Sequence, residues 1–149
     1  MTKNRPLVIA GCLSFLASLL HVLCIWGGPD WYLLLGAGQE MADMAAAGDL
    51  YPTLVTAFIA VVLALWGVFA FSGAGIIIQL PFLKTALILI TSIYLLRGVA
   101  GLLAPFVTTS AAIQQNSITF WLVSSLICCV YGTCYLLGTI RLWGEENNP

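Results

Sequence analysis

Residues 81–104 read PFLKTALILITSIYLLRGVAGLLA and contain two charged side chains, Lys84 and Arg97. An α-helix that crosses the hydrocarbon core of a bilayer needs about 20 predominantly apolar residues, and this run provides them. Pro81 is tolerated in the first turn of a helix, so we expect the helix to begin near it and to end before Pro105. The run is too long for a strand, and its apolar residues do not alternate with polar ones. The stretch therefore predicts a transmembrane helix.

Three further runs have a similar length and character, at residues 7–27, 53–71 and 118–142. Over the whole chain of 149 residues, 61% are hydrophobic and 7% are charged. A soluble domain carries about 25% charged residues, because water must solvate its surface. Lipid must therefore surround most of this protein. The sequence predicts an all-α integral membrane protein, a single domain over residues 1–149 whose four spans form an antiparallel four-helix bundle.

The basic residues near the ends of these spans fall on one side of the membrane if the chain crosses it four times. They are Lys3, Arg5, Lys84 and Arg141. The two longer connections, 28–52 and 105–117, contain no Lys or Arg. By the positive-inside rule, both termini and the short 73–80 turn are predicted to be cytoplasmic, and the two longer connections to face outward.

The outer connection 28–52 contains a short predicted helix, Gln39–Ala47, after an apolar segment that is unsuited to water. Helical spacing gives this short helix one acidic face and one Met/Ala face. These faces are Glu40, Asp43 and Ala47 on one side, and Met41, Met44 and Ala45 on the other. We expect the helix to lie at the interface as a lid, with its Met/Ala face on the mouth of the bundle. Its acidic face then points to solvent or turns inward.

Three side chains inside the predicted spans are candidates for a polar site, namely His21, Tyr94 and Arg97. Arg97 lies about 10 Å below the outer interface and His21 about 9 Å below it, counting 1.5 Å per helical residue. Tyr94 is one helical turn deeper than Arg97, on the same side of the helix. A charged arginine at this depth costs up to about 2.5–3.5 kcal/mol, so it should find an anionic partner, face the bundle or snorkel. The candidate ligand-binding residues are therefore these three and the nearby acids of the outer loop, namely His21, Arg97, Glu40, Asp43, Tyr94 and Asp30.

Each of these residues also has a purely structural explanation. Glu40 and Asp43 can be the wet face of an interfacial helix, and His21 can form a hydrogen bond between helices. Arg97 can form a structural ion pair or snorkel toward lipid phosphates. Tyr94 can be a core aromatic residue. The binding hypothesis depends on their convergence on the outer half of one small bundle.

Three functions fit this pattern. The first is a pocket, open outward, that binds a small amphiphile or a lipid headgroup, with or without catalysis; whether the protein is an enzyme stays open. The second is a non-enzymatic interaction protein or accessory subunit that docks another membrane protein or a second copy of itself. The third, a small dimeric transporter, is disfavoured because proton-coupled transport needs a carboxylate within the spans, and they contain none.

The sequence predicts no cofactor, no metal site and no nucleic-acid partner. One histidine cannot supply two axial haem ligands, and a lone histidine without clustered Cys or Asp falls short of the usual metal-ligand sets. The five cysteines contain no C-x-x-C pair for thiol exchange, and we interpret them as small buried residues. A net charge of −1 cannot neutralise phosphate backbones.

Several short motifs spread over most of the chain resemble those of an uncharacterised group of small bacterial four-span inner-membrane proteins. They are His21, Gly27-Gly28-Pro29-Asp30-Trp31-Tyr32, Gly36-Ala37-Gly38, Leu65-Trp66, Ser72-Gly73-Ala74-Gly75, Leu80-Pro81 and Tyr94-Leu95-Leu96-Arg97-Gly98. The resemblance implies a bacterial inner-membrane location and no particular activity. A looser similarity, in architecture alone, is to four-span sterol-isomerase-like proteins. Their pockets hold acids within the helices, which this chain lacks, so no residue role is transferred from them.

Overall fold

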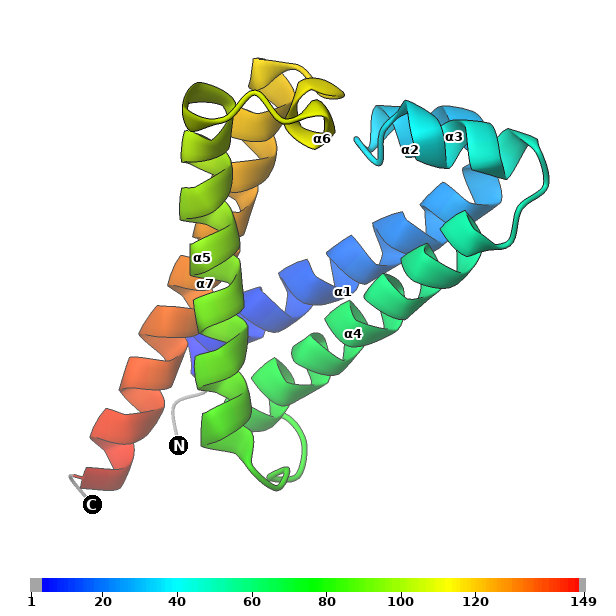
Figure 1. Ribbon diagram of the computed structural model, residues 1–149. Coiled ribbons are helices and arrows are strands. Elements are labelled where there is room, and N and C mark those ends of the chain that lie inside the picture. Colours follow the sequence, from blue (N-terminus) through cyan, green and yellow to red (C-terminus); the bar gives the residue numbers. More distant parts are fainter. Residues whose placement is uncertain (1–3, 148–149) are drawn as a thin grey trace.

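The computed structural model describes residues 4–147, and all regular structure in that range is helical. Four of these helices are long and apolar enough to cross a membrane. They are α1 (Arg5–Gly27), α4 (Tyr51–Gly73), α5 (Leu83–Val107) and α7 (Ile118–Asn147). Three short helices lie in the connections, α2 (Pro29–Leu34), α3 (Gln39–Ala46) and α6 (Ala111–Gln114) (Figure 1). The short helix expected in the first outer connection is therefore present.

The third long helix differs from its predicted span at both ends. Phe82 adopts a left-handed backbone conformation, with φ of 56°, immediately before α5. Pro81 consequently lies outside the helix instead of in its first turn. Pro105 lies inside the helix, which continues to Val107. A proline so close to the helix end removes one backbone hydrogen bond and leaves little helix beyond it to disrupt.

The four long helices pack as two antiparallel pairs. α1 packs along α4 and α5 packs along α7, while contacts between the pairs are fewer. Figure 1 shows the pairs meeting at one end and diverging toward the other, like the arms of a V. The bundle is therefore not closed along its full length, because the two helix pairs diverge toward one end.

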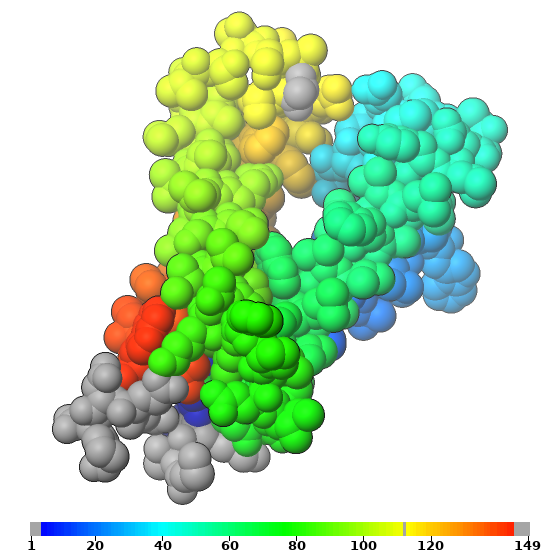
Figure 2. Space-filling view, turned by 60° about the horizontal axis from the view of Figure 1, so that its bottom comes forward, coloured from blue at the N-terminus to red at the C-terminus, as the bar shows by residue number. Residues whose placement is uncertain are grey.

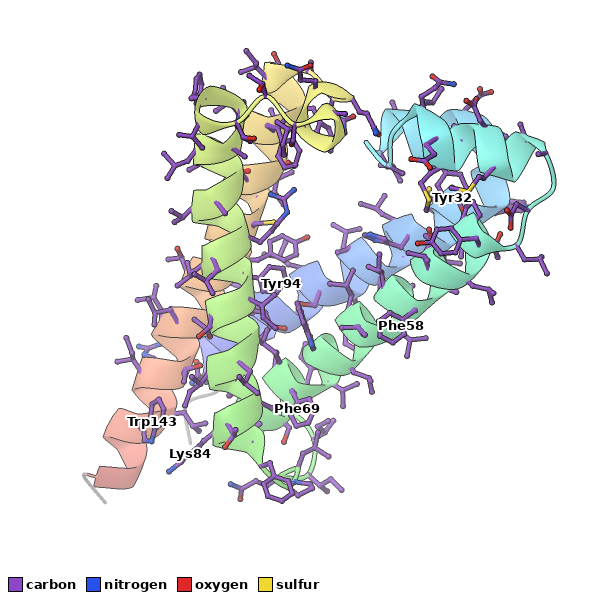
Figure 3. The ribbon with its side chains drawn as sticks, viewed as in Figure 1. Tyr32, Phe58, Phe69, Lys84, Tyr94 and Trp143 are labelled. Atoms are coloured by element: carbon purple, nitrogen blue, oxygen red, sulfur yellow. The ribbon has the colours of Figure 1, made fainter. Side chains whose placement is uncertain are left out.

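The two ends of the V carry different connections. The closed end carries Asn4, the C-terminal part of α7 and the 74–82 connection, and the open end carries α2, α3 and α6 (Figure 1). Lys84 lies at the closed end, where its Nζ atom is 5.9 Å from the centre of the Trp143 ring (Figure 3). The first and last residues that the structure describes and the short connection thus share one end of the molecule.

Small residues bring the two pairs together at the closed end. Gly138 of α7 has no room for a Cβ atom, because the fully buried Leu7 of α1 occupies that position. Asn4 also donates a hydrogen bond from Nδ2 to the Gly138 carbonyl oxygen, at 2.8 Å. Small residues at helix crossings favour this close approach.

Tyrosine hydroxyl groups join the pairs further along. Tyr135 of α7 donates to the carbonyl oxygen of Trp66 in α4 at 3.0 Å. Because that phenol has a single hydrogen, Ser14 of α1 must be the donor in the 2.8 Å contact between its hydroxyl and Tyr135. Tyr131 donates to the carbonyl oxygen of Leu13 at 3.0 Å. Three helices are therefore hydrogen-bonded at the point where the arms of the V begin to separate.

Candidate functional site

A cavity of about 770 Å³ lies between the two pairs in the open half of the molecule. All four long helices contribute to its walls, and the connections at the open end contribute to its upper part. The space-filling view shows the hollow between α4 and α5 (Figure 2). Its volume falls in the range of about 300–1,000 Å³ that is typical of small-molecule sites.

Arg97 lines this cavity from α5. The centre of its guanidinium group lies 5.0 Å from the centre of the Trp121 ring, in a cation–π contact. Its Nη1 atom is 3.5 Å from the Ser125 hydroxyl oxygen, which is a long hydrogen bond. Gly101, one turn along α5, has no side chain where the guanidinium group lies. The Arg97 side chain therefore extends along α5 in the C-terminal direction, toward the open end.

Within residues 4–144, no carboxylate forms an ion pair with Arg97. Among the side chains that the structure describes, its recorded polar partners are Ser125 and Trp121, both of which are uncharged. No Asp or Glu is among the residues that line the cavity. A guanidinium group has several N–H donors, so most of its hydrogen-bonding capacity is left for another molecule.

His21 lines the same cavity from α1, in the other helix pair. Its Nδ1 atom is 2.8 Å from the carbonyl oxygen of Ala17, one helical turn earlier. A carbonyl oxygen can only accept, so Nδ1 carries the hydrogen and Nε2 of the neutral ring is an acceptor. The imidazole ring is thus oriented by its own helix and has a second nitrogen for a ligand.

Tyr94 lies at the bottom of the cavity, in a cluster of aromatic rings (Figure 3). Its ring centre is 5.0 Å from that of Trp66, 5.3 Å from that of Tyr131 and 5.7 Å from that of Tyr135. The Tyr94 hydroxyl lies beside Ser14, yet it is buried without a hydrogen-bond partner of its own. The lower part of the cavity is therefore aromatic, with few polar atoms.

The two connections at the open end and the first turn of α7 meet above the cavity and form a roof, which we define as Gly36, Ala37, Gln115, Asn116 and Phe120. Asn116 donates a hydrogen bond from Nδ2 to the Gly36 carbonyl oxygen, at 3.0 Å. Gly36 has a positive φ of 79°, and the Phe120 ring occupies the space that its side chain would need. The roof thus joins the two helix pairs at the open end.

The acidic candidates lie elsewhere. Asp30, Glu40 and Asp43 are exposed, and none of them lines the cavity. On α3 the opposite face is packed, since Ala42 is buried in a cluster with Cys24. Of the two orientations expected for the acidic face, the structure therefore has the one toward solvent.

The structure thus brings together His21, Arg97 and Tyr94 from the predicted set, and not the three acids. The carboxylate partner expected for Arg97 from the outer loop does not contact it among the described residues. Trp121, which contacts Arg97, is not among the predicted site residues. Both residues are a few positions from the outer ends of their spans, so their similar depth was a signal for this pairing.

No protein family, curated protein or solved structure matches this sequence. The resemblance to small bacterial four-span proteins therefore stays a prediction. Within the described part of the chain, no group of three or more His, Cys, Asp or Glu residues could hold a metal ion. The evidence on function is accordingly the geometry of the cavity itself.

Proposed function

We propose that the protein binds an amphiphile with an anionic group in the cavity between its helix pairs. The observation that carries this proposal is Arg97, a cationic side chain without a carboxylate partner in a cavity whose lining contains no acid. A charge placed in such surroundings is costly unless it is paired. An anionic ligand supplies the missing charge, and the planar guanidinium group can bind it with two parallel hydrogen bonds.

The remaining lining suits the apolar part of such a molecule. Most of the cavity wall is apolar, and its larger aliphatic side chains are Leu20, Leu35, Val55, Ile59, Leu63 and Ile127. The polar side chains His21, Gln115 and Asn116 gather with Arg97 toward the open end. An amphiphile would therefore place its headgroup beneath the roof and its apolar part toward the aromatic cluster around Tyr94.

The orientation in the membrane is part of the proposal. Arg5, Lys84 and Arg141 belong to the closed end, so the positive-inside rule directs that end to the cytoplasm. Together with the resemblance to bacterial proteins, this supports a cavity in the outer half of a bacterial inner membrane. A green fluorescent protein fused after Pro149 should fluoresce, and alkaline phosphatase fused there should be inactive. The opposite result would mean that the cavity faces the cytoplasm.

The binding proposal is tested with three probes that share one chain length: dodecyl phosphate, dodecanol and dodecyltrimethylammonium. The protein is purified in dodecyl maltoside and its thermal unfolding midpoint is measured against probe concentration. Dodecyl phosphate should raise the midpoint, because binding to the folded state stabilises it. The cationic probe should have no such effect, and dodecanol should have less.

Arg97→Gln identifies the site. Loss of a hydrogen bond between charged groups, about 1.5–3 kcal/mol, should weaken dodecyl phosphate binding by about tenfold or more. Arg141→Gln, which removes the same charge from α7 outside the cavity, is the matched control and should bind like the wild type. Wild-type affinity in a folded Arg97→Gln variant would refute the proposal. Stoichiometric co-purification of another membrane protein would then favour the accessory-subunit hypothesis.

A further inference from the structure

We infer that the molecule bound in this cavity enters sideways from the bilayer, through the opening between α4 and α5, and is therefore a membrane lipid with an anionic headgroup. The inference rests on the proposed function and extends it, because the same anionic group could belong to a lipid or to a water-soluble metabolite. Three observations favour the lipid.

The first observation is that the roof closes the end of the cavity that faces the outer connections. The Asn116–Gly36 hydrogen bond and the Phe120 ring join the connection before α7 to the one after α2. Gln115 packs in the same way against Gly38, whose positive φ of 94° and missing side chain leave space for it. A solute from the aqueous side would have to separate these contacts before it reached Arg97.

The second observation is that the side of the cavity is open. α4 and α5 contact each other through the rings of Trp66 and Tyr94, whose centres are 5.0 Å apart. From this contact the two helices diverge toward the open end (Figures 1 and 3). The space-filling view shows an opening between these two helices that passes into the hollow (Figure 2). Since both helices are long and apolar enough to cross a membrane, this opening lies at the level of the lipid chains.

The third observation is the polarity of the rim and of the interior. Val55 and Ile59 line the cavity from α4, and Ile59 is also 37% exposed, so this edge of the opening is aliphatic. Arg97 lines it from α5 and is also exposed, so a headgroup that enters here meets the guanidinium group first. A lipid can move its headgroup beneath the roof and one acyl chain toward the aromatic cluster around Tyr94, while the rest of its apolar part stays in the bilayer. A water-soluble anion would be poorly solvated at an aliphatic entrance.

The test uses the protein in nanodiscs of phosphatidylcholine that contain phosphatidic acid with a photoactivatable diazirine in one acyl chain. After irradiation, cross-linked peptides should map to the cavity-facing residues of α4 and α5. Ile59→Trp places a large ring in the opening, and an obstruction worth about 1.4 kcal/mol lowers lipid affinity about tenfold. Val61→Trp, on the outward face of α4 where Val61 is 58% exposed, is the matched control and should cross-link like the wild type.

Glycerol 3-phosphate distinguishes the two sources, because it carries the same phosphate monoester without the chains. It should neither stabilise the protein nor reduce cross-linking. If it competes with phosphatidic acid, and if Ile59→Trp changes nothing, the lateral route is refuted while the anion site stands. If phosphatidic acid and glycerol 3-phosphate both give signals that Arg97→Gln leaves unchanged, or no signal at all, the proposed function itself fails.

Discussion

At the closed end, the two helix pairs touch through glycine, asparagine and hydroxyl groups, whereas toward the open end the same pairs diverge around a cavity. Gly138 admits Leu7 at the closed end, and Tyr135 is bonded to both other helices nearby. At the open end, Trp121 and Leu20 project into the space between the pairs. All four helices are similarly apolar, so the difference lies in how the two pairs pack against each other.

The comparison also explains where a charge can be tolerated. The closed end lets helix backbones approach closely, as at Gly138. The open end gives Arg97 an aromatic face, a hydroxyl group and a cavity. We conclude that tight packing of one half fixes the angle between the pairs, and that this angle creates the site in the other half.

The largest effect is expected from Gly138→Leu. The new side chain would collide with Leu7, which is fully buried and cannot move to solvent. Overpacking of this kind costs about 1–3 kcal/mol. The midpoint of unfolding in SDS, followed by circular dichroism, should fall accordingly.

Two further variants make this result specific. Gly144→Leu lies on the same helix with open space around its Cβ position, so it should unfold like the wild type. Leu7→Ala in the Gly138→Leu background should recover part of the loss, since it restores the total volume. If Gly138→Leu and Gly144→Leu are equally stable, the closed end is not packed as described.

A smaller effect is expected from Tyr135→Phe, which leaves the ring and removes the hydroxyl group that joins α7 to α1 and α4. The Trp66 carbonyl oxygen loses its donor and the Ser14 hydroxyl loses its acceptor. The loss should be about 1 kcal/mol, measured by the same SDS titration. Tyr51→Phe, whose residue is 56% exposed, is the control and should change stability little. If both variants changed the stability equally, the Tyr135 hydroxyl group would not join α7 to α1 and α4.

Much of the fold could be predicted from the sequence because single helices leave strong local signals. Length and apolar character locate each long helix to within a few residues, and the Met/Ala face of α3 predicts its packing side. The angle between the pairs could not be predicted, because it depends on which glycine meets which side chain. Gly138 and Leu7 are separated by almost the whole chain, and neither has a local pattern that identifies its partner.

The candidate site, like the fold, could be predicted from the sequence only in part. Depth counting along the spans predicted that His21 and Arg97 would be near one level, and both do line one cavity. It could not predict that the acids would be directed to solvent, since either face of α3 could have turned inward. The structure resolves this through the contacts of the apolar face, where Ala42 is 3% exposed.

At the roof, Asn116→Ala should have a modest effect on stability, about 0.5 kcal/mol, because water can replace this hydrogen bond. The effect on local opening of the roof should be clearer than the effect on stability. The Ala37 amide, which donates to the Tyr32 carbonyl oxygen at 2.8 Å, should exchange its hydrogen faster once Gly36 is released. Hydrogen–deuterium exchange of the peptide that covers residues 33–40 measures this change. Gln114→Ala, an exposed position in α6, is the control, and identical exchange in both variants would mean that Asn116 does not hold the roof.

The smallest effect, and the one that separates the site from its surroundings, is expected from Glu40→Gln combined with Asp43→Asn. Both carboxylates are exposed, and Asp43 accepts a hydrogen bond from Gln39 within the same helix at 2.8 Å. Charges that are separated from a ligand by more than about 8 Å are largely screened at physiological ionic strength. The double variant should therefore bind dodecyl phosphate within about twofold of wild-type affinity, whereas Arg97→Gln weakens it about tenfold. A tenfold change in either direction would mean that the acidic face of α3 turns toward the cavity in the bound protein, and the anion would then share its arginine with a carboxylate.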